Sequence, residues 1–177
     1  GMAAQEALVV HVADDGTVFA GANGGGLFRS DDGGATWLSR NGTVYATTAP
    51  GAIATAPNFA VVPHMVTGSY WNGGLAYSND RGQTWTEAAS GPRNQIRALV
   101  YSPNYPAENL VLAGTGGGWP ADIDGIYRST DGGANWTQVD NQLKGKYIIS
   151  LAAAPTTGQN WAVFAGVYGD GVWRSTG

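Results

Sequence analysis

Aromatic residues stand beside polar side chains in three segments of this 177-residue chain, with carboxylates in two of them, a combination that suits binding or cleavage of a sugar. The segments are 69–74, 115–125 and 167–171, and their candidate residues are Tyr70, Trp71, Asn72, Trp119, Asp122, Asp124, Tyr168 and Asp170. Aromatic rings stack on the apolar face of a pyranose, and carboxylates accept hydrogen bonds from its hydroxyl groups. Clustered in a cleft, such residues form a ligand site.

Hydrolysis of a glycoside requires two carboxyl groups on either side of the scissile bond. Asp122 or Asp124 together with Asp170 is the pair that the sequence offers, because these residues lie on successive loops. In the plainer interpretation the aromatic residues cover neighbouring sheets or a partner chain, and the aspartates cap turns. The residues alone leave both interpretations open.

An eight-residue phrase determines where these loops must lie. It reads SDDGGATW at 30–37, SNDRGQTW at 78–85 and STDGGANW at 129–136, and it begins again at Ser175. The copies start roughly 50 residues apart, a period typical of arrays of similar supersecondary units.

Aligned on this phrase, each unit divides into four short segments rich in β-branched and aromatic residues and bounded by Gly, Pro, Asn or Asp. The first segments are 8–13, 53–56, 96–101 and 148–153, and the second are 17–21, 65–68, 110–114 and 162–166. The third segments are 27–30, 75–78, 126–129 and 172–175, and the fourth are 37–40, 85–88 and 136–139. The pattern predicts an all-β chain, a β-propeller of four-stranded antiparallel blades. A β-sandwich is the alternative, but a sandwich requires no fixed repeat.

The repeated phrase has a mechanical explanation at the turn between the third and fourth strands. Its aspartate can accept hydrogen bonds from turn N–H groups, its glycine adopts a backbone shape that side chains oppose, and its tryptophan can pack between sheets. We assign this structural role to Ser30, Asp32, Gly34, Trp37, Ser78, Asp80, Gly82, Trp85, Ser129, Asp131, Gly133 and Trp136. Identical copies on every unit argue against catalysis by these aspartates.

The segments 28–37 and 127–136 resemble the Asp-box, or BNR, repeat, although the third copy carries Asn135 where the repeat has Thr. The run 102–105 and its echo at 56–59 resemble the turn between the first two strands of the same repeats. Proteins with this repeat include sialidases, xyloglucan-cleaving glycosidases, sortilin-type receptors and photosystem II assembly factors. The resemblance implies a fold rather than one activity. It also implies that ligands bind mainly on the face opposite the Asp-boxes, where the three segments named first would lie.

The predicted ring is incomplete. We place one propeller domain at 1–177, with blades at about 6–41, 51–89, 95–140 and 147–177, which makes about three and three-quarter blades. A second copy of the chain would complete a ring of about seven or eight blades as a homodimer. A closed four-bladed ring of one chain, or a fragment of a longer protein, are the alternatives.

Composition excludes several classes of function. The formal net charge is −4 without any basic run, so we expect no nucleic-acid partner. The chain has no Cys, no apolar run long enough for a membrane span, and two His without spaced partners, so we expect no metal or other cofactor. No secretory signal opens the sequence, which leaves the compartment extracellular, periplasmic or cytoplasmic.

These observations favour a non-catalytic binding or scaffold propeller that associates with itself. Its loops opposite the Asp-boxes would bind a glycan or a protein segment. The alternative is a glycoside hydrolase resembling the xyloglucan-cleaving enzymes. A sialidase is disfavoured, because Arg29, Arg128 and Arg174 fill one structural slot of the repeat and no Glu is paired with a loop Tyr.

Overall fold

The computed structural model describes residues 6–42, 49–71, 73–117, 124–139, 142–156 and 160–176, and these form β-strands and turns without a helix. The first sheet contains β1 (Ala7–Val12), β2 (Val18–Ala22), β3 (Gly26–Ser30) and β4 (Leu38–Ser39), and the second contains β5 (Pro50–Thr55), β6 (Met65–Ser69), β7 (Leu75–Ser78) and β8 (Thr86–Glu87). The third contains β9 (Ile96–Tyr101), β10 (Val111–Thr115), β11 (Gly125–Ser129) and β12 (Thr137–Gln138), and the last contains β13 (Ile148–Pro155), β14 (Trp161–Val167) and β15 (Gly171–Thr176).

All pairing is antiparallel between consecutive strands, so each sheet is a meander. Three sheets have four strands, and the last has three within the described part of the chain. The prediction of an all-β chain with about three and three-quarter blades is therefore confirmed. The fourth strands contain only two residues each, shorter than predicted, because the tryptophan that precedes each belongs to the turn.

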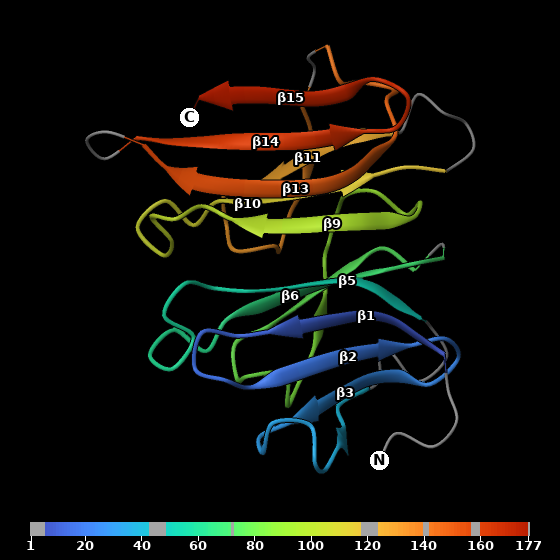
Figure 1. The fold of residues 1–177 in the computed structure, drawn as a ribbon, viewed down its shortest axis with the longest axis vertical. Coiled ribbons are helices and arrows are strands. Elements are labelled where there is room, and N and C mark those ends of the chain that lie inside the picture. Colours follow the sequence, from blue (N-terminus) through green and yellow to red (C-terminus); the bar gives the residue numbers. More distant parts are fainter. Residues whose placement is uncertain are drawn as a thin grey trace.

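The sheets form an open row (Figure 1). The four inner strands β1, β5, β9 and β13 lie next to one another in chain order, while the first and last sheets lie at opposite ends. The chain thus does not form the closed four-bladed ring that the sequence left as an alternative. The described residues include no helix with the length and apolar character that a membrane crossing requires.

One glycine per sheet allows the next sheet to approach closely. It occupies the same position in β2, β6 and β10, and the first residue of the next inner strand lies directly against it. The contacting pairs are Gly21 with Pro50, Gly68 with Ile96, and Gly114 with Ile148. A Cβ atom at Gly68 would lie 2.4 Å from Ile96, a distance at which the sheets must move apart.

A tryptophan fills the space between consecutive sheets farther from the inner strands. Trp85 is 9% exposed and belongs to one buried cluster with Phe19 and Leu27 of the first sheet and Met65 of the second. Trp136 is 4% exposed and belongs to the corresponding cluster between the second and third sheets.

Trp37, the tryptophan of the first phrase, is only half-buried. No sheet of the described chain precedes the first sheet, so this indole lacks the second wall that the others have.

Each Asp-box is a closed network of hydrogen bonds. In the first, Ser30 Oγ donates to Asp32 Oδ1 over 2.7 Å and accepts from the backbone N–H of Gly34 over 2.8 Å. Thr36 donates to the same carboxylate from its backbone N–H over 2.8 Å and from its hydroxyl over 2.6 Å. The side-chain hydrogen bond from Thr36 is the largest of the contacts that lower the pKa of Asp32 to about 2.

The other two boxes repeat this network, with Asn135 Nδ2 donating to Asp131 over 2.8 Å in place of the threonine hydroxyl. For Asp80 and Asp131 burial acts to raise the pKa, but the hydrogen bonds from Thr84, Asn135 and the box serines outweigh it and the net shift is downward. These carboxylates hold turns together.

We predict that Trp85→Ala lowers the free energy of unfolding by about 3–5 kcal/mol, because it empties a large aromatic site between two sheets. Chemical denaturation monitored by circular dichroism measures the loss. Trp37→Ala is the matched control and should cost clearly less, since its indole is half-buried. Equal losses in the two variants would contradict the role of Trp85 between sheets.

Acid should weaken the fold in a defined window. The pKa of Asp32 is about 2 in the folded protein against 3.8 ordinarily, so its hydrogen bonds stabilise the fold fully above pH 3.8 and are lost as the pH falls to about 2. The denaturant concentration at which half of the protein is unfolded should therefore decrease as the pH is lowered from about 5 to about 2. The triple variant Asp32→Asn, Asp80→Asn, Asp131→Asn should show a smaller fall, and Glu87→Gln, an exposed carboxylate outside the boxes, should behave as the parent does.

Candidate functional site

An arginine between two tyrosines forms the centre of the candidate site. Arg97 lies on β9, Tyr70 follows β6, and Tyr147 directly precedes β13. The guanidinium carbon of Arg97 lies 4.4 Å from the ring centroid of Tyr70 and 5.4 Å from that of Tyr147. Both are cation–π distances, and the three side chains therefore connect the inner ends of three consecutive sheets.

Two exposed rings extend this row at its ends. Trp71 meets Tyr70 edge to face with centroids 4.8 Å apart, and Tyr168 lies 5.6 Å from Tyr147. Trp71 is 53% exposed and Tyr168 71% exposed, so their faces are open to a ligand. We call these five residues, Trp71, Tyr70, Arg97, Tyr147 and Tyr168, the aromatic–arginine row.

Three of the predicted ligand-binding residues, Tyr70, Trp71 and Tyr168, thus lie in one row. Asn72 and Trp119 lie outside the described residues. Arg97 and Tyr147 are not among the predicted ligand-binding residues, all of which come from the loops between second and third strands. The signal for Tyr147 was its position immediately before an inner strand, where the chain emerges on the same face as those loops.

Arg97 brings a positive charge to this row. Its Nη2 donates a hydrogen bond to Gln95 Oε1, and its Nε is buried without a hydrogen-bond partner. Within the described residues no carboxylate forms an ion pair with it.

A groove runs from Arg97 along the inner strands. A hollow of about 240 Å³ between Gly51, Arg97 and Ile149 continues into one of about 280 Å³ beside His11 and Thr55, and Ile53 and Leu99 line both.

At the far end of the groove, His11 Nε2 lies 2.8 Å from Thr55 Oγ1. Burial lowers the pKa of His11 below its ordinary 6.5, so its ring is uncharged at neutral pH. The positive charge of the groove is therefore at the Arg97 end.

The described carboxylates of the predicted catalytic pair already have partners. Asp124 is buried, and it accepts hydrogen bonds from Asn94 Nδ2 over 2.5 Å and from the backbone N–H of Gly117 over 3.1 Å. Asp170 forms an ion pair of 2.7 Å with Lys146. Asp124 thus holds its loop in place, and Asp122 lies outside the described residues.

A second histidine is buried on the Asp-box side of the molecule. His64 Nδ1 lies 2.7 Å from the hydroxyl oxygen of Tyr101, and Tyr105 and Tyr77 pack on its ring. Burial lowers the pKa of His64 to about 4, so this cluster is an uncharged part of the core. In the residues that the structure describes, no three His, Cys, Asp or Glu side chains gather as a metal site requires.

Comparison with known proteins identifies the repeat and the fold. The model of the BNR/Asp-box repeat matches residues 76–87, which contain the second copy of the phrase. A search of curated protein sequences gives no match.

Solved structures share the arrangement of the sheets. An ancestral GH74 enzyme superposes with a TM-score of 0.67 at 19% identity, over 97% of this chain and 24% of that one. A GH74 enzyme of Niastella koreensis gives a TM-score of 0.63 at 23% identity, over 94% of this chain and 23% of that one. The chain therefore spans about a quarter of the length of these enzymes. The computationally designed Ika4 protein gives 0.65 at 16% identity, over 97% of this chain and 91% of Ika4.

Identities this low establish the shared fold and leave the activity open. The four consecutive antiparallel sheets, the glycine and tryptophan contacts between them and the match to the repeat model agree with one another. The chain therefore has the β-propeller fold, and its residues 76–87 match the BNR/Asp-box repeat.

Proposed function

We propose that this protein is a non-catalytic binding module and that it binds a glycan along the aromatic–arginine row. The observation that carries the proposal is the continuous contact from Trp71 through Arg97 to Tyr168 at the mouth of the groove. Exposed indole and phenol rings offer flat faces for the C–H side of a sugar ring. A guanidinium carries several N–H groups that can donate to its oxygens.

The carboxylates support binding rather than hydrolysis. A glycosidase needs one carboxyl that stays protonated and one that is free to attack or to activate water. Asp124 is buried and engaged by two donors, and Asp170 is held by Lys146. Of the predicted catalytic residues this leaves Asp122, which lies outside the described residues.

We further propose that two copies of the chain close one ring. The outward face of the first sheet carries the half-buried Trp37, and the outward face of the last sheet carries Val172, which is 75% exposed. Val172 occupies the repeat position of Leu27 and Leu75, which are 0% and 4% exposed. Those two leucines belong to the clusters that receive Trp85 and Trp136.

The two terminal faces are therefore complementary. The far face of the last sheet offers Val172 and the half-buried Phe164, and the near face of the first sheet offers Trp37. Joining the last sheet of one copy to the first sheet of the other would repeat the contact found twice within the chain. Applied in both directions, this contact closes a two-fold symmetric ring of about eight blades.

Glycan binding is tested by titrating immobilised neutral and acidic polysaccharides with the protein. Arg97→Gln and Trp71→Ala should each weaken binding at least about tenfold, because they remove a charged donor and an exposed ring. Arg128→Gln removes an exposed arginine of β11 outside the row and should bind as the parent does. Equal affinity of the Arg97 and Arg128 variants would refute the site. Release of reducing sugar that disappears in Asp122→Asn or Asp170→Asn would instead establish a glycosidase.

Ring closure is tested by light scattering. The parent should have the mass of two chains, and Val172→Arg should have the mass of one, because it places a charge in the contact between copies. Val61→Arg is the matched control, since Val61 is 72% exposed but lies in a turn outside the terminal faces. A parent with the mass of one chain would refute ring closure.

A further inference from the structure

Each inner strand contains a β-bulge at its second residue. The extra residue of the bulge has no partner in the second strand, and it occupies the same repeat position in all four sheets. The four bulge residues are Leu8, Gly51, Arg97 and Ile149. A bulge redirects the side chain of its extra residue, and bulges are common beside binding sites. Arg97 is the charged residue among the four, so the repeat itself does not require an arginine at this position.

The backbone beside each bulge is constant as well. In every sheet the residue after the second strand donates its N–H to the carbonyl of the residue before the inner strand, over 2.7–3.1 Å. The donor and acceptor pairs are Asn23 with Glu6, Tyr70 with Ala49, Gly116 with Gln95, and Tyr168 with Tyr147. The fold therefore fixes the place of these positions, while their side chains differ from sheet to sheet.

Two glycines make room for the tyrosines beside Arg97. A Cβ atom at Gly51 would lie 2.8 Å from the Cβ atom of Tyr70. A Cβ atom at Gly116 would overlap the ring of Tyr147. Side chains at these two repeat positions would displace the tyrosines, so the glycines and the tyrosines form one arrangement around the arginine.

The guanidinium of Arg97 is held from three directions. The rings of Tyr70 and Tyr147 lie at cation–π distance, and Nη2 donates a hydrogen bond to the uncharged amide of Gln95. A side chain held in this way loses little conformational freedom when a ligand binds. Arg97 also lines the hollow of about 240 Å³ at its end of the groove, so a ligand in this hollow contacts the arginine.

We propose that the aromatic–arginine row selects an acidic glycan and that Arg97 binds the carboxylate of a uronic acid unit. This inference rests on the proposed function and specifies its ligand. The planar fork of a guanidinium matches the two oxygens of a carboxylate, and such charge-assisted hydrogen bonds are roughly twice as strong as neutral ones. The formal net charge of the chain is −4, so the preference comes from the contact with Arg97 and not from attraction by the whole chain.

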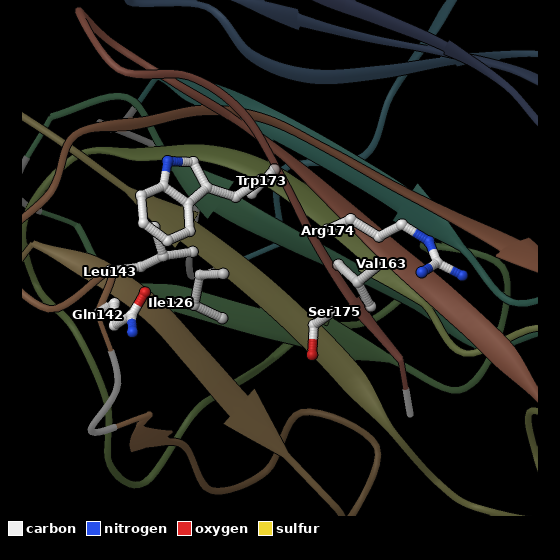
Figure 2. A pocket seen from close by; sticks show the side chains of 8 residues that line it. Ile126, Gln142, Leu143, Val163, Trp173, Arg174 and Ser175 are labelled. Atoms are coloured by element: carbon white, nitrogen blue, oxygen red, sulfur yellow. The ribbon is translucent and has the colours of Figure 1, made fainter.

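A separate cavity of about 340 Å³ between the third and last sheets has a different character. Figure 2 shows Trp173, Leu143, Ile126 and Val163 around it, while the side chain of Arg174 extends away. Most of this lining is apolar, so a preference for a carboxylate would not arise there.

The experiment measures binding of the protein to polygalacturonate, alginate and hyaluronan, each beside its carboxyl-reduced form. Reduction replaces the carboxylate with a hydroxymethyl group and keeps the sugar chain. At least one acid should bind at least about tenfold more tightly than its reduced form, because the hydrogen bonds to a charged group are lost. Equal binding of each acid and its reduced form, or binding of neutral glycans alone, would overturn this inference and leave the glycan site in place. No binding of any glycan, neutral ones included, would refute the proposed function as well.

Three arginine variants and one cavity variant locate the preference. Arg97→Gln should bind the acid and its reduced form equally, and Arg97→Lys should keep part of the preference, because it retains the charge without the planar fork. Arg128→Gln, which removes an exposed arginine of β11, and Ala165→Leu, which fills the separate cavity, should keep the full preference. A preference that survives in Arg97→Gln, or that disappears in Ala165→Leu, would overturn the proposal.

A double-mutant cycle tests whether glycine positions the row. Gly116→Ala should weaken binding of the acid several-fold, because its methyl group takes the place of the Tyr147 ring. In the Tyr147→Ala background the same change should have no further effect, since the ring is gone. Circular dichroism spectra check that each variant is folded. Equal losses from Gly116→Ala in the two backgrounds would contradict the arrangement around Arg97.

Discussion

The close contact between each inner strand and the glycine of the preceding sheet is the constraint on which the structure depends. A Cβ atom at Gly68 would lie 2.4 Å from Ile96, so no other residue allows the sheets to meet at this distance. Sheets that meet closely at their inner ends diverge toward their outer ends, since each is twisted. The outer gap needs a large side chain, and Trp85 and Trp136 fill it. The glycine at the inner strands and the tryptophan at the outer strands thus together set the angle between consecutive sheets.

In this arrangement each sheet is stabilised by its contacts with the sheets beside it. The first and last sheets have only one neighbour within the described chain, so they differ from the two middle sheets. Trp37 is half-buried and Val172 is exposed, although their repeat counterparts are buried. The proposed ring contact follows from the same rule, applied at the far face of the last sheet.

The fold was predictable from the sequence because the repeat is local and periodic. Three copies of an eight-residue phrase fixed the turn, and the alternation of short segments around it fixed the meander. The predicted lengths of β4, β8 and β12 were too long, because the tryptophan at the start of each predicted segment belongs to the turn and not to the strand. In the third copy, Trp136 donates its indole N–H to the Gly133 carbonyl of this turn over 2.8 Å.

The site was only partly predictable. Rings in loops are visible in a sequence, but the stacking of Arg97 between Tyr70 and Tyr147 joins three different sheets.

The charged groups on the two faces of the propeller differ, with the Asp-box carboxylates on one face and Arg97 on the other. The Asp-box carboxylates look chemically promising, yet Asp32 receives hydrogen bonds from three groups and its pKa is about 2. A carboxylate so well satisfied is a poor proton acceptor at neutral pH and has no proton to donate. On the opposite face Arg97 keeps a buried Nε without a partner. The groups left for the proposed ligand are therefore the guanidinium and the exposed rings of the aromatic–arginine row, and not the carboxylates of the Asp-boxes.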